Sequence, residues 1–224
     1  SIQTFADEFE KLGHSVLIIG PKTEQEEPSD DKVWRFRSMP FPFQKEYRII
    51  LPLSRKLKHF KHEQIDIIHG QTPFTMGYLS RYLAYRHKLP LIHTYHTYFE
   101  KYLHYLPLPS DIATSYAKSE SRRFYNRCDH IVVPSSQMKD ALLDYQIQTA
   151  IDVVPTGVKL GQHPSDAEKD TFLKTHGLNP NTPKAIFVGR LGQEKNVYFL
   201  LDAFAQIHNA HPDLELLIIG DGPE

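Results

Sequence analysis

Three residues near the C-terminal end of the sequence have the types and spacing needed to bind a diphosphate. Gly189 and Arg190 directly follow the apolar run Ala185 to Val188, and Lys195 comes five positions later, at the start of an expected helix. A helix N-terminus attracts anions, and a guanidinium offers a fork of donors that suits phosphate oxygens. Lys195 would add a second, more flexible charge, and Gly189 would let a ligand approach the backbone closely. The alternative is a β-α-β unit whose basic residues are only solvated.

His96 is the candidate for chemistry in the first part of the chain. It lies in a tyrosine-rich segment, His93 to Tyr102, that continues directly from the apolar run Leu91 to Thr94. Open parallel sheets bind their ligands at the carboxyl ends of strands, so His96 lies where chemistry is usually sited. A hydrogen-bonded structural histidine is the alternative. Metal binding by His93 and His96 has little support, because no cysteine or carboxylate partner is evident.

Alternating strands and helices must position these residues. The expected strands are short β-branched or apolar runs of the kind buried in parallel sheets, at Val16 to Ile19, Val33 to Phe36, Ile65 to His69, Leu91 to Thr94, His130 to Val133, Ile151 to Val154, Ala185 to Val188 and Leu214 to Ile219. Helices are expected at Ile2 to Leu12, Pro52 to His62, Met76 to His87, Ile112 to Asn126, Gln137 to Asp144, Asp166 to His176 and Asn196 to Ala210. This alternation predicts an α/β protein with doubly wound parallel sheets.

The alternation is interrupted between Gly157 and Pro183, where Gly, Pro, Asn and Ser cluster. We therefore expect two Rossmann-like domains, residues 1–159 and 160–224, facing a cleft. The sequence begins with a helix rather than a strand and ends in the loop Gly220-Asp221-Gly222-Pro223-Glu224. Both domains are therefore expected to be truncated in this chain.

Charge is distributed unevenly although the formal net charge is only −1. The segment from Lys45 to His62 holds six Lys and Arg residues against one Glu. On an amphipathic helix from Pro52, its basic side chains would lie away from Leu57 and Phe60, which suits binding to anionic lipid. An ordinary surface helix is the alternative, and nucleic acid is not favoured because no binding motif accompanies the charge. The candidate membrane-binding residues are Arg48, Arg55, Lys56, Lys58 and Lys61.

Cysteine content and hydropathy bear on the compartment. The only cysteine, Cys128, cannot form an internal disulfide, which suits a reducing cytoplasm. No apolar run in the sequence is long enough to cross a membrane. We therefore expect a cytoplasmic protein that associates peripherally with the inner face of the cell membrane.

Several motifs resemble those of retaining glycosyltransferases of family four. They are Phe187-Val188-Gly189-Arg190-Leu191, Glu194-Lys195-Asn196, Gly220-Asp221-Gly222-Pro223-Glu224 and the interdomain turn Pro155-Thr156-Gly157-Val158. The segment His93 to Tyr102, followed by His104 and Tyr105, is similar to the bacterial diacylglycerol glucosyltransferase branch of that family. The resemblance spans nearly the whole chain.

The resemblance implies a GT-B fold, in which the C-terminal domain binds the nucleotide sugar and the N-terminal domain binds the acceptor. It makes Gly189, Arg190 and Lys195 the diphosphate site and His96 the active-site histidine. The implied reaction moves a hexose, glucose from UDP-glucose, to a membrane lipid such as diacylglycerol, with retained anomeric configuration and without a metal ion or other cofactor. The family's glycine loop and glutamate pair are expected to lie outside this chain, so the chain itself is expected to be inactive.

Two alternatives to this function stay open. One keeps the nucleotide-sugar donor and changes the acceptor to a soluble sugar or polysaccharide. The other is a non-catalytic Rossmann-type module that binds a dinucleotide, although the first complete β-α turn has no Gly-x-Gly-x-x-Gly motif.

Overall fold

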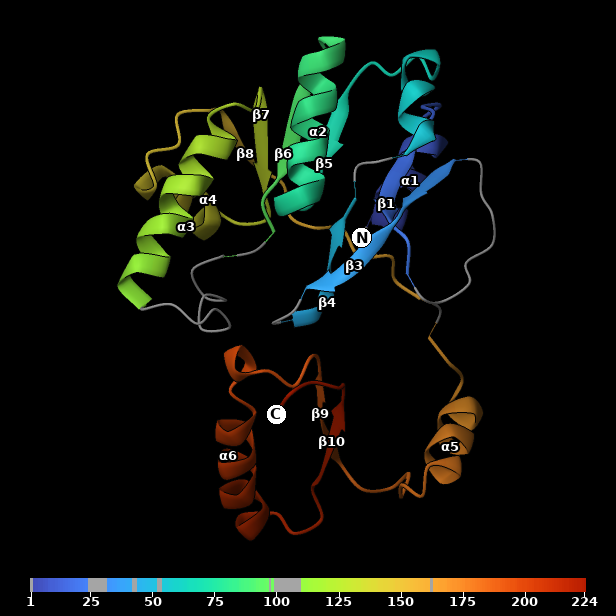
Figure 1. Cartoon of the computed structure of the whole chain (residues 1–224). Helices are drawn as coiled ribbons and strands as arrows, with labels where there is room; N and C mark the ends of the chain where they lie inside the picture. The colour runs from blue at the N-terminus through green and yellow to red at the C-terminus, as the bar shows by residue number, and fades with distance from the viewer. Residues whose placement is uncertain are drawn as a thin grey trace. The chain divides into compact units, whose positions relative to one another are not determined.

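The chain is divided into two compact units, each with its own sheet and helices. The computed structural model describes residues 2–23, 32–41, 44–51, 54–96, 98, 110–161 and 163–224. Unit 1 is Ser1–Lys159 and unit 2 is Leu160–Glu224. Figure 1 shows strands and helices alternating along both units, so the expected α/β class with parallel sheets is confirmed. No helix among the described residues is both long enough and apolar enough to cross a membrane.

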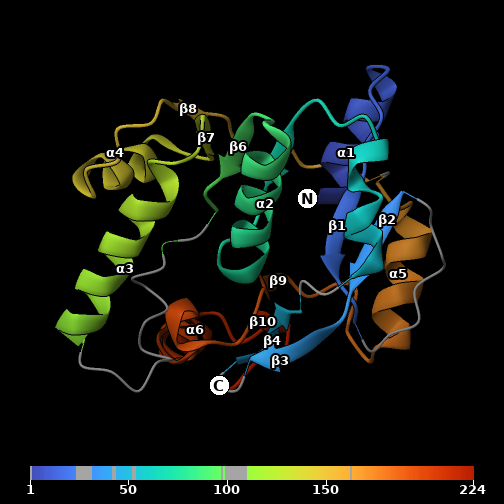
Figure 2. The ribbon, with the colours of Figure 1, turned by 45° about the horizontal axis from the view of Figure 1, so that its top comes forward.

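A four-stranded parallel sheet, in the order β5-β6-β7-β8, is the centre of unit 1. Its strands are β5 (Ile68–Gly70), β6 (Leu91–Thr94), β7 (His130–Val133) and β8 (Ile151–Val153), and its connecting helices are α2 (Phe74–His87), α3 (Ser110–Tyr125) and α4 (Ser136–Asp144). Both views place α3 and α4 together beside β7 and β8 (Figure 1, Figure 2). Because all four strands run the same way, the loops that follow them meet at one edge of the sheet.

A second group of strands precedes this sheet. Helix α1 (Ile2–Lys11) leads to β1 (Ile18–Pro21), which pairs in parallel with β2 (Val33–Phe36). The next two strands, β3 (Ser38–Phe41) and β4 (Gln44–Ile50), form an antiparallel pair with a register shift between Pro40 and Phe41. The sequence did not predict this pair, because its strands mix apolar residues with proline and charged residues.

The predicted amphipathic α-helix from Pro52 to His62 is wrong. The described part of this segment forms two 3₁₀ turns, η1 (Arg55–Lys58) and η2 (Phe60–His62), while residues 52 and 53 lie outside the described residues. A 3₁₀ turn places residues i and i+3 on one side. Leu57 and Phe60 have this spacing, and both pack against the cluster that contains Trp34, in which Phe60 is only 3% exposed.

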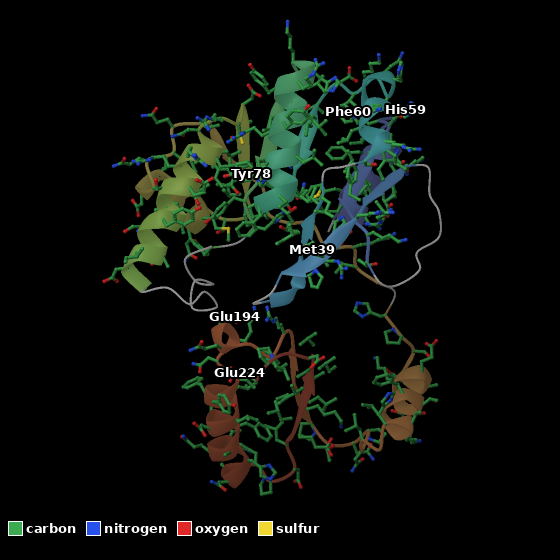
Figure 3. All side chains as sticks on the ribbon, viewed as in Figure 1. Met39, His59, Phe60, Tyr78, Glu194 and Glu224 are labelled. Atoms are coloured by element: carbon green, nitrogen blue, oxygen red, sulfur yellow. The ribbon has the colours of Figure 1, made fainter. Side chains whose placement is uncertain are left out.

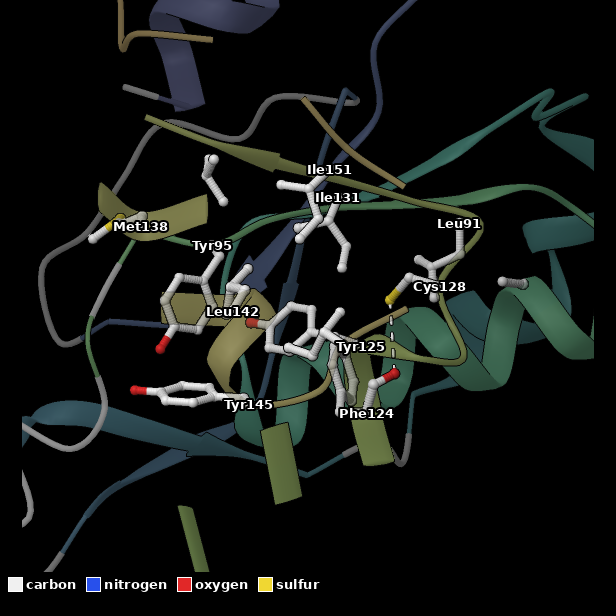
Figure 4. Packing of buried hydrophobic residues seen from close by; sticks show 13 residues of the cluster. Leu91, Tyr95, Phe124, Tyr125, Cys128, Ile131, Met138, Leu142, Tyr145 and Ile151 are labelled. Carbon is white, nitrogen blue, oxygen red and sulfur yellow. Dashed lines mark hydrogen bonds between the residues drawn. The ribbon is translucent and has the colours of Figure 1, made fainter. Parts of the chain in front are cut away.

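Two hydrophobic clusters hold unit 1 together, and α2 contributes to both. One cluster joins β2 and β4 to α2, through Trp34, Phe36, Ile50, Phe60, Leu79 and Leu83. The other lies against the four-stranded sheet and includes Ala84, Leu91, Phe124, Tyr125, Ile131, Leu142 and Ile151 (Figure 4). Cys128 belongs to the second cluster, and burial raises the pKa of its thiol to about 12, so it stays protonated at neutral pH.

Unit 2 contains a parallel strand pair and the helix that connects it. Its elements are α5 (Asp166–Thr175), β9 (Lys184–Val188), η4 (Gln193–Lys195), α6 (Val197–Ala210) and β10 (Glu215–Ile219). Strands β9 and β10 pair in register from Lys184 with Glu215 to Val188 with Ile219. Helix α5 begins with a capping box in which Ser165 and Glu168 satisfy each other's backbone N–H groups.

Candidate functional site

Four polar side chains meet at the carboxyl edge of the four-stranded sheet in unit 1. His96 Nε2 lies 2.7 Å from Gln71 Oε1, and Gln71 Nε2 lies 3.0 Å from His69 Nε2. The same nitrogen of His69 lies 2.7 Å from Thr94 Oγ1. His69 lies in β5 and Thr94 ends the neighbouring strand β6, while Gln71 and His96 follow these two strands. We call these four residues the carboxyl-edge cluster.

Close packing of β5 against β6 fixes the loop that carries Gln71. A Cβ atom at Gly70 would lie 2.4 Å from His93 Cδ2, so only glycine fits beside the fully buried His93 ring. His93 Nε2 lies 3.3 Å from the carbonyl oxygen of Thr72, to which it donates a hydrogen bond as a neutral ring. The residues before and after Gln71, Gly70 and Thr72, therefore both contact His93 of β6, which fixes the position of this loop.

The surroundings of these histidines favour their neutral forms. Burial lowers the pKa of His69 and of His96 below the ordinary value, and it lowers the pKa of His93 to about 4. The His93 ring packs edge-on against the rings of Phe124 and Tyr125, with centroids 5.1 Å apart in both pairs. At neutral pH the cluster can thus offer uncharged imidazole nitrogens that donate or accept hydrogen bonds.

In unit 2 the predicted phosphate loop is an extension of the β9–β10 pair. Gly189 donates its backbone N–H to the carbonyl oxygen of Ile219 at 3.0 Å, and Leu191 donates to that of Asp221 at 3.0 Å. The amide of Gly189 is therefore used within the sheet. Glycine is required instead at Gly220, where a Cβ atom would lie 1.8 Å from the carbonyl oxygen of Gly189. Arg190 is half-buried between the two bonded residues.

Lys195 was expected at the start of a helix, and the structure corrects this detail. It ends the 3₁₀ turn η4, and Asn196 follows in the left-handed conformation with φ of 52° before α6 begins at Val197. Asparagine is one of the few residues that adopt this conformation at modest cost. The Asn196 side chain makes no capping hydrogen bond to α6. The exposed Lys195 thus lies one residue before the N-cap of α6, at the end of the helix whose dipole attracts anions.

The predicted membrane-binding residues have different environments. Arg48 Nε donates to Ser38 Oγ at 2.8 Å within the β3–β4 pair, and Lys56 Nζ lies 5.9 Å from the centre of the Trp34 ring. The three others, Arg55, Lys58 and Lys61, are exposed on η1 and η2.

The end of α2 extends this charged area. The rings of Phe60 and His87 are 4.9 Å apart, which brings the exposed Arg86 and Lys88 beside η2. Figure 3 labels Phe60 and His59 at this end of unit 1. We call Arg55, Lys58, Lys61, Arg86 and Lys88 the basic surface.

Sequence reasoning found His96 but missed His69 and Gln71. Their position was a signal, because His69 lies in β5 and Gln71 directly follows that strand, much as His96 comes just after β6. Residues 97 and 99–105, which belong to the tyrosine-rich segment or directly follow it, lie outside the described residues. Among the described residues, no three His, Cys, Asp or Glu side chains come together in a way that could hold a metal ion.

The sequence was also compared with known proteins. The profile named Glycosyltransferase Family 4 matches residues 1–162, and the profile named Glycosyl transferases group 1 matches residues 168–224. The alpha-monoglucosyldiacylglycerol synthases of Streptococcus pneumoniae and Acholeplasma laidlawii are 34% and 26% identical over the whole chain, which covers 52% and 59% of them. A GDP-mannose-dependent alpha-mannosyltransferase of Mycolicibacterium smegmatis is 27% identical over 99% of the chain and 58% of its own length. The chain thus spans about half the length of these relatives, and it belongs to Glycosyltransferase Family 4.

Proposed function

We propose that the protein carrying this chain is a retaining glycosyltransferase that moves glucose from UDP-glucose to a membrane lipid such as diacylglycerol. The observation that carries the proposal is the match of both units to glycosyltransferase profiles, together with relatives over the whole chain that are named for diacylglycerol glucosylation. Retention of configuration follows from the family resemblance. The relatives named for GDP-mannose make the donor a point that must be tested.

Unit 2 supplies part of the donor site in this proposal. The guanidinium of Arg190, the ammonium of Lys195 and the N-terminus of α6 bind the diphosphate of the nucleotide sugar. Departure of the nucleoside diphosphate leaves negative charge on its oxygens, and fixed cations lower the energy of that transition state. These groups carry the charge that a divalent ion supplies in other enzymes, so we expect activity to survive a chelator. Gly189 contributes through its backbone, which donates a hydrogen bond to Ile219 and packs closely against Gly220.

Unit 1 supplies His96 and the membrane contact. The basic surface presents five exposed cations from η1, η2 and the end of α2. Each basic side chain near an anionic bilayer contributes about 1 kcal/mol of binding free energy. We propose that the protein binds peripherally to the cytoplasmic face of the membrane, where a lipid acceptor is accessible.

The test of the reaction is glycosyl transfer by the whole protein that carries this chain. We would incubate it with radiolabelled UDP-glucose or GDP-mannose, vesicles of anionic lipid that contain diacylglycerol, and EDTA, then separate the lipid products. Glucose incorporated into a glycolipid supports the proposal. Transfer only to a soluble sugar would assign the soluble-acceptor alternative, and transfer only from GDP-mannose would replace the donor.

The membrane contact is tested separately by vesicle co-sedimentation. Replacing Arg55, Lys58 and Lys61 with Gln removes three charges, worth about 3 kcal/mol, so partitioning to anionic vesicles should fall about 100-fold. The matched control replaces three exposed lysines of the linker and α5, Lys159, Lys169 and Lys174, and should change partitioning less than about two-fold. Equal effects of both triple variants would contradict a specific basic surface.

A further inference from the structure

The carboxyl-edge cluster contains a glutamine between two histidines, and its two amide atoms face different rings. Gln71 Oε1 lies 2.7 Å from His96 Nε2, while Gln71 Nε2 lies 3.0 Å from His69 Nε2 and 3.4 Å from His69 Nδ1. An amide oxygen carries no hydrogen, so His96 Nε2 must be the donor of the short hydrogen bond. The amide group thus determines which nitrogen of His96 is protonated.

The other side of the amide is held by a second ring. His69 Nε2 also contacts Thr94 Oγ1 at 2.7 Å, and the edge of the His69 ring meets Phe5 of α1 with centroids 6.3 Å apart. In a doubly protonated His69, an N–H group would face the amide hydrogens of Gln71 and repel them. Only a neutral His69 can therefore accept a hydrogen bond from the Gln71 amide. With the Gln71 amide turned over, its N–H would instead donate to His96 Nε2, and the proton of the neutral His96 ring would then lie on Nδ1.

This arrangement determines the protonation of the other ring nitrogen of His96, Nδ1. With its proton on Nε2, the neutral ring has its lone pair on Nδ1. The described residues offer that nitrogen no hydrogen-bond partner. His96 is half-buried in the loop after β6, where ligands of parallel sheets bind.

We propose that Gln71 is a positioning residue for His96, holding its Nε2–H so that Nδ1 accepts a hydrogen bond from a hydroxyl group of the sugar or of the acceptor alcohol. The role of the bound hydroxyl rests on the proposed function, whereas the protonation of the ring does not. His69 and Thr94 hold the amide of Gln71 in turn. The titratable groups that act on His96 are His69 of β5, His93 of β6 and the N-terminal amino group of the chain, and the charge of that amino group also lowers the pKa of His96.

The first test is the tautomer of His96 in the 224-residue chain. Two-bond ¹H–¹⁵N spectra of histidine-labelled protein at neutral pH distinguish the Nε2–H form from the Nδ1–H form, and His96→Gln assigns the signal. We expect the Nε2–H form in the wild-type chain. An Nδ1–H form would overturn the proposal without any further variant.

The second test changes the amide while keeping its shape. In Gln71→Glu a carboxylate replaces the amide at 2.7 Å from His96 Nε2 and favours the charged ring, so the proton affinity of His96 should rise about ten-fold or more. Gln71→Leu removes the acceptor, so His96 should become a mixture of tautomers. Gln148→Glu, in the exposed segment before β8 at the opposite edge of the sheet, is the matched control and should leave His96 unchanged. A His96 titration that is the same in Gln71→Glu and in wild type would contradict the proposal.

The third test links the ring to turnover in the whole protein. Gln71→Glu should move the acidic limb of the kcat profile to higher pH, because the proton must leave His96 before Nδ1 can accept a hydrogen bond. A lower kcat with an unshifted limb would mean a structural role only. If no donor gives turnover, the proposed function fails while the tautomer and titration still decide the role of Gln71.

Discussion

Acid should destabilise unit 1 through His93, which is not a surface histidine that titrates freely. The ring is fully buried against Phe124 and Tyr125, and its Nε2–H is donated to the carbonyl oxygen of Thr72. Burial lowers its pKa from 6.5 to about 4. We would therefore lower the pH from 7 to 5 and compare the loss in free energy of unfolding between the wild-type chain and His93→Gln. The glutamine keeps an N–H donor but cannot titrate.

The direction follows from proton binding in the two states. An unfolded chain protonates this ring below its ordinary pKa near 6.5, whereas the native ring is protonated only below about 4. Between these values the unfolded state binds more protons, so the free energy of unfolding falls as the pH is lowered. The difference in pKa corresponds to about 3 kcal/mol in total, of which about 2 kcal/mol is lost between pH 7 and pH 5.

The assay is urea unfolding followed by the fluorescence of Trp34. Trp34 is the only tryptophan of the sequence, is 6% exposed and belongs to the same unit as His93. Wild type should lose about 2 kcal/mol more than His93→Gln between the two pH values. His69 and His96, whose pKa values are also lowered, remain in both proteins and contribute to both measurements. Parallel losses in wild type and variant would refute the assignment of a neutral buried His93.

Two further predictions concern unit 2. Gly220→Ala should destabilise the β9–β10 pair by about 1–3 kcal/mol, because the new Cβ would lie 1.8 Å from the carbonyl oxygen of Gly189. Amide hydrogen exchange in both strands should therefore become faster. The control is Gly157→Ala, whose Cβ would have no other atom within 4 Å, and it should leave the exchange rates unchanged. Arg190→Gln should weaken UDP binding to the whole protein about ten-fold or more by calorimetry, because a hydrogen bond to a charged group contributes about 1.5–3 kcal/mol. Lys174→Gln in α5 is the control for Arg190, and equal affinities of the two variants would contradict the diphosphate assignment.

Strand type and position were predictable where the sequence alone determined burial. The runs that became β2, β6 and β7 have the predicted bounds, because apolar and β-branched residues begin and end sharply there. Boundaries shifted where polar residues adjoin the strand, so that β5 begins at Ile68 rather than at Ile65. The β3–β4 pair was missed because its pairing depends on contacts across the turn and on the core beneath Ile50, not on a local alternation.

The segment around η1 and η2 was misjudged because helix periodicity and 3₁₀ spacing share the i, i+3 contact. Leu57 and Phe60 satisfy both spacings, and the cluster into which they pack includes Trp34 of β2 and Leu83 of α2, which lie outside this segment of the sequence. The exposed charge of Arg55, Lys58 and Lys61 did not depend on that choice. What the sequence could not supply was the neighbouring end of α2, which reaches η2 through the contact of Phe60 with His87.

The same logic explains why one residue of the carboxyl-edge cluster was predicted and its partner was not. His96 stands out because a titratable ring lies just after a clear strand, whereas Gln71 is uncharged and its only signal is its position after the strand before β6. Its importance arises only when β5 and β6 pair in parallel, because that pairing brings the residues after both strands to one edge. Gly70 makes this approach possible by leaving room for the His93 ring. The carboxyl-edge cluster is thus encoded by the glycine and the strand register as much as by its own polar side chains. Gly70→Ala should therefore separate Gln71 from His96 without altering either residue.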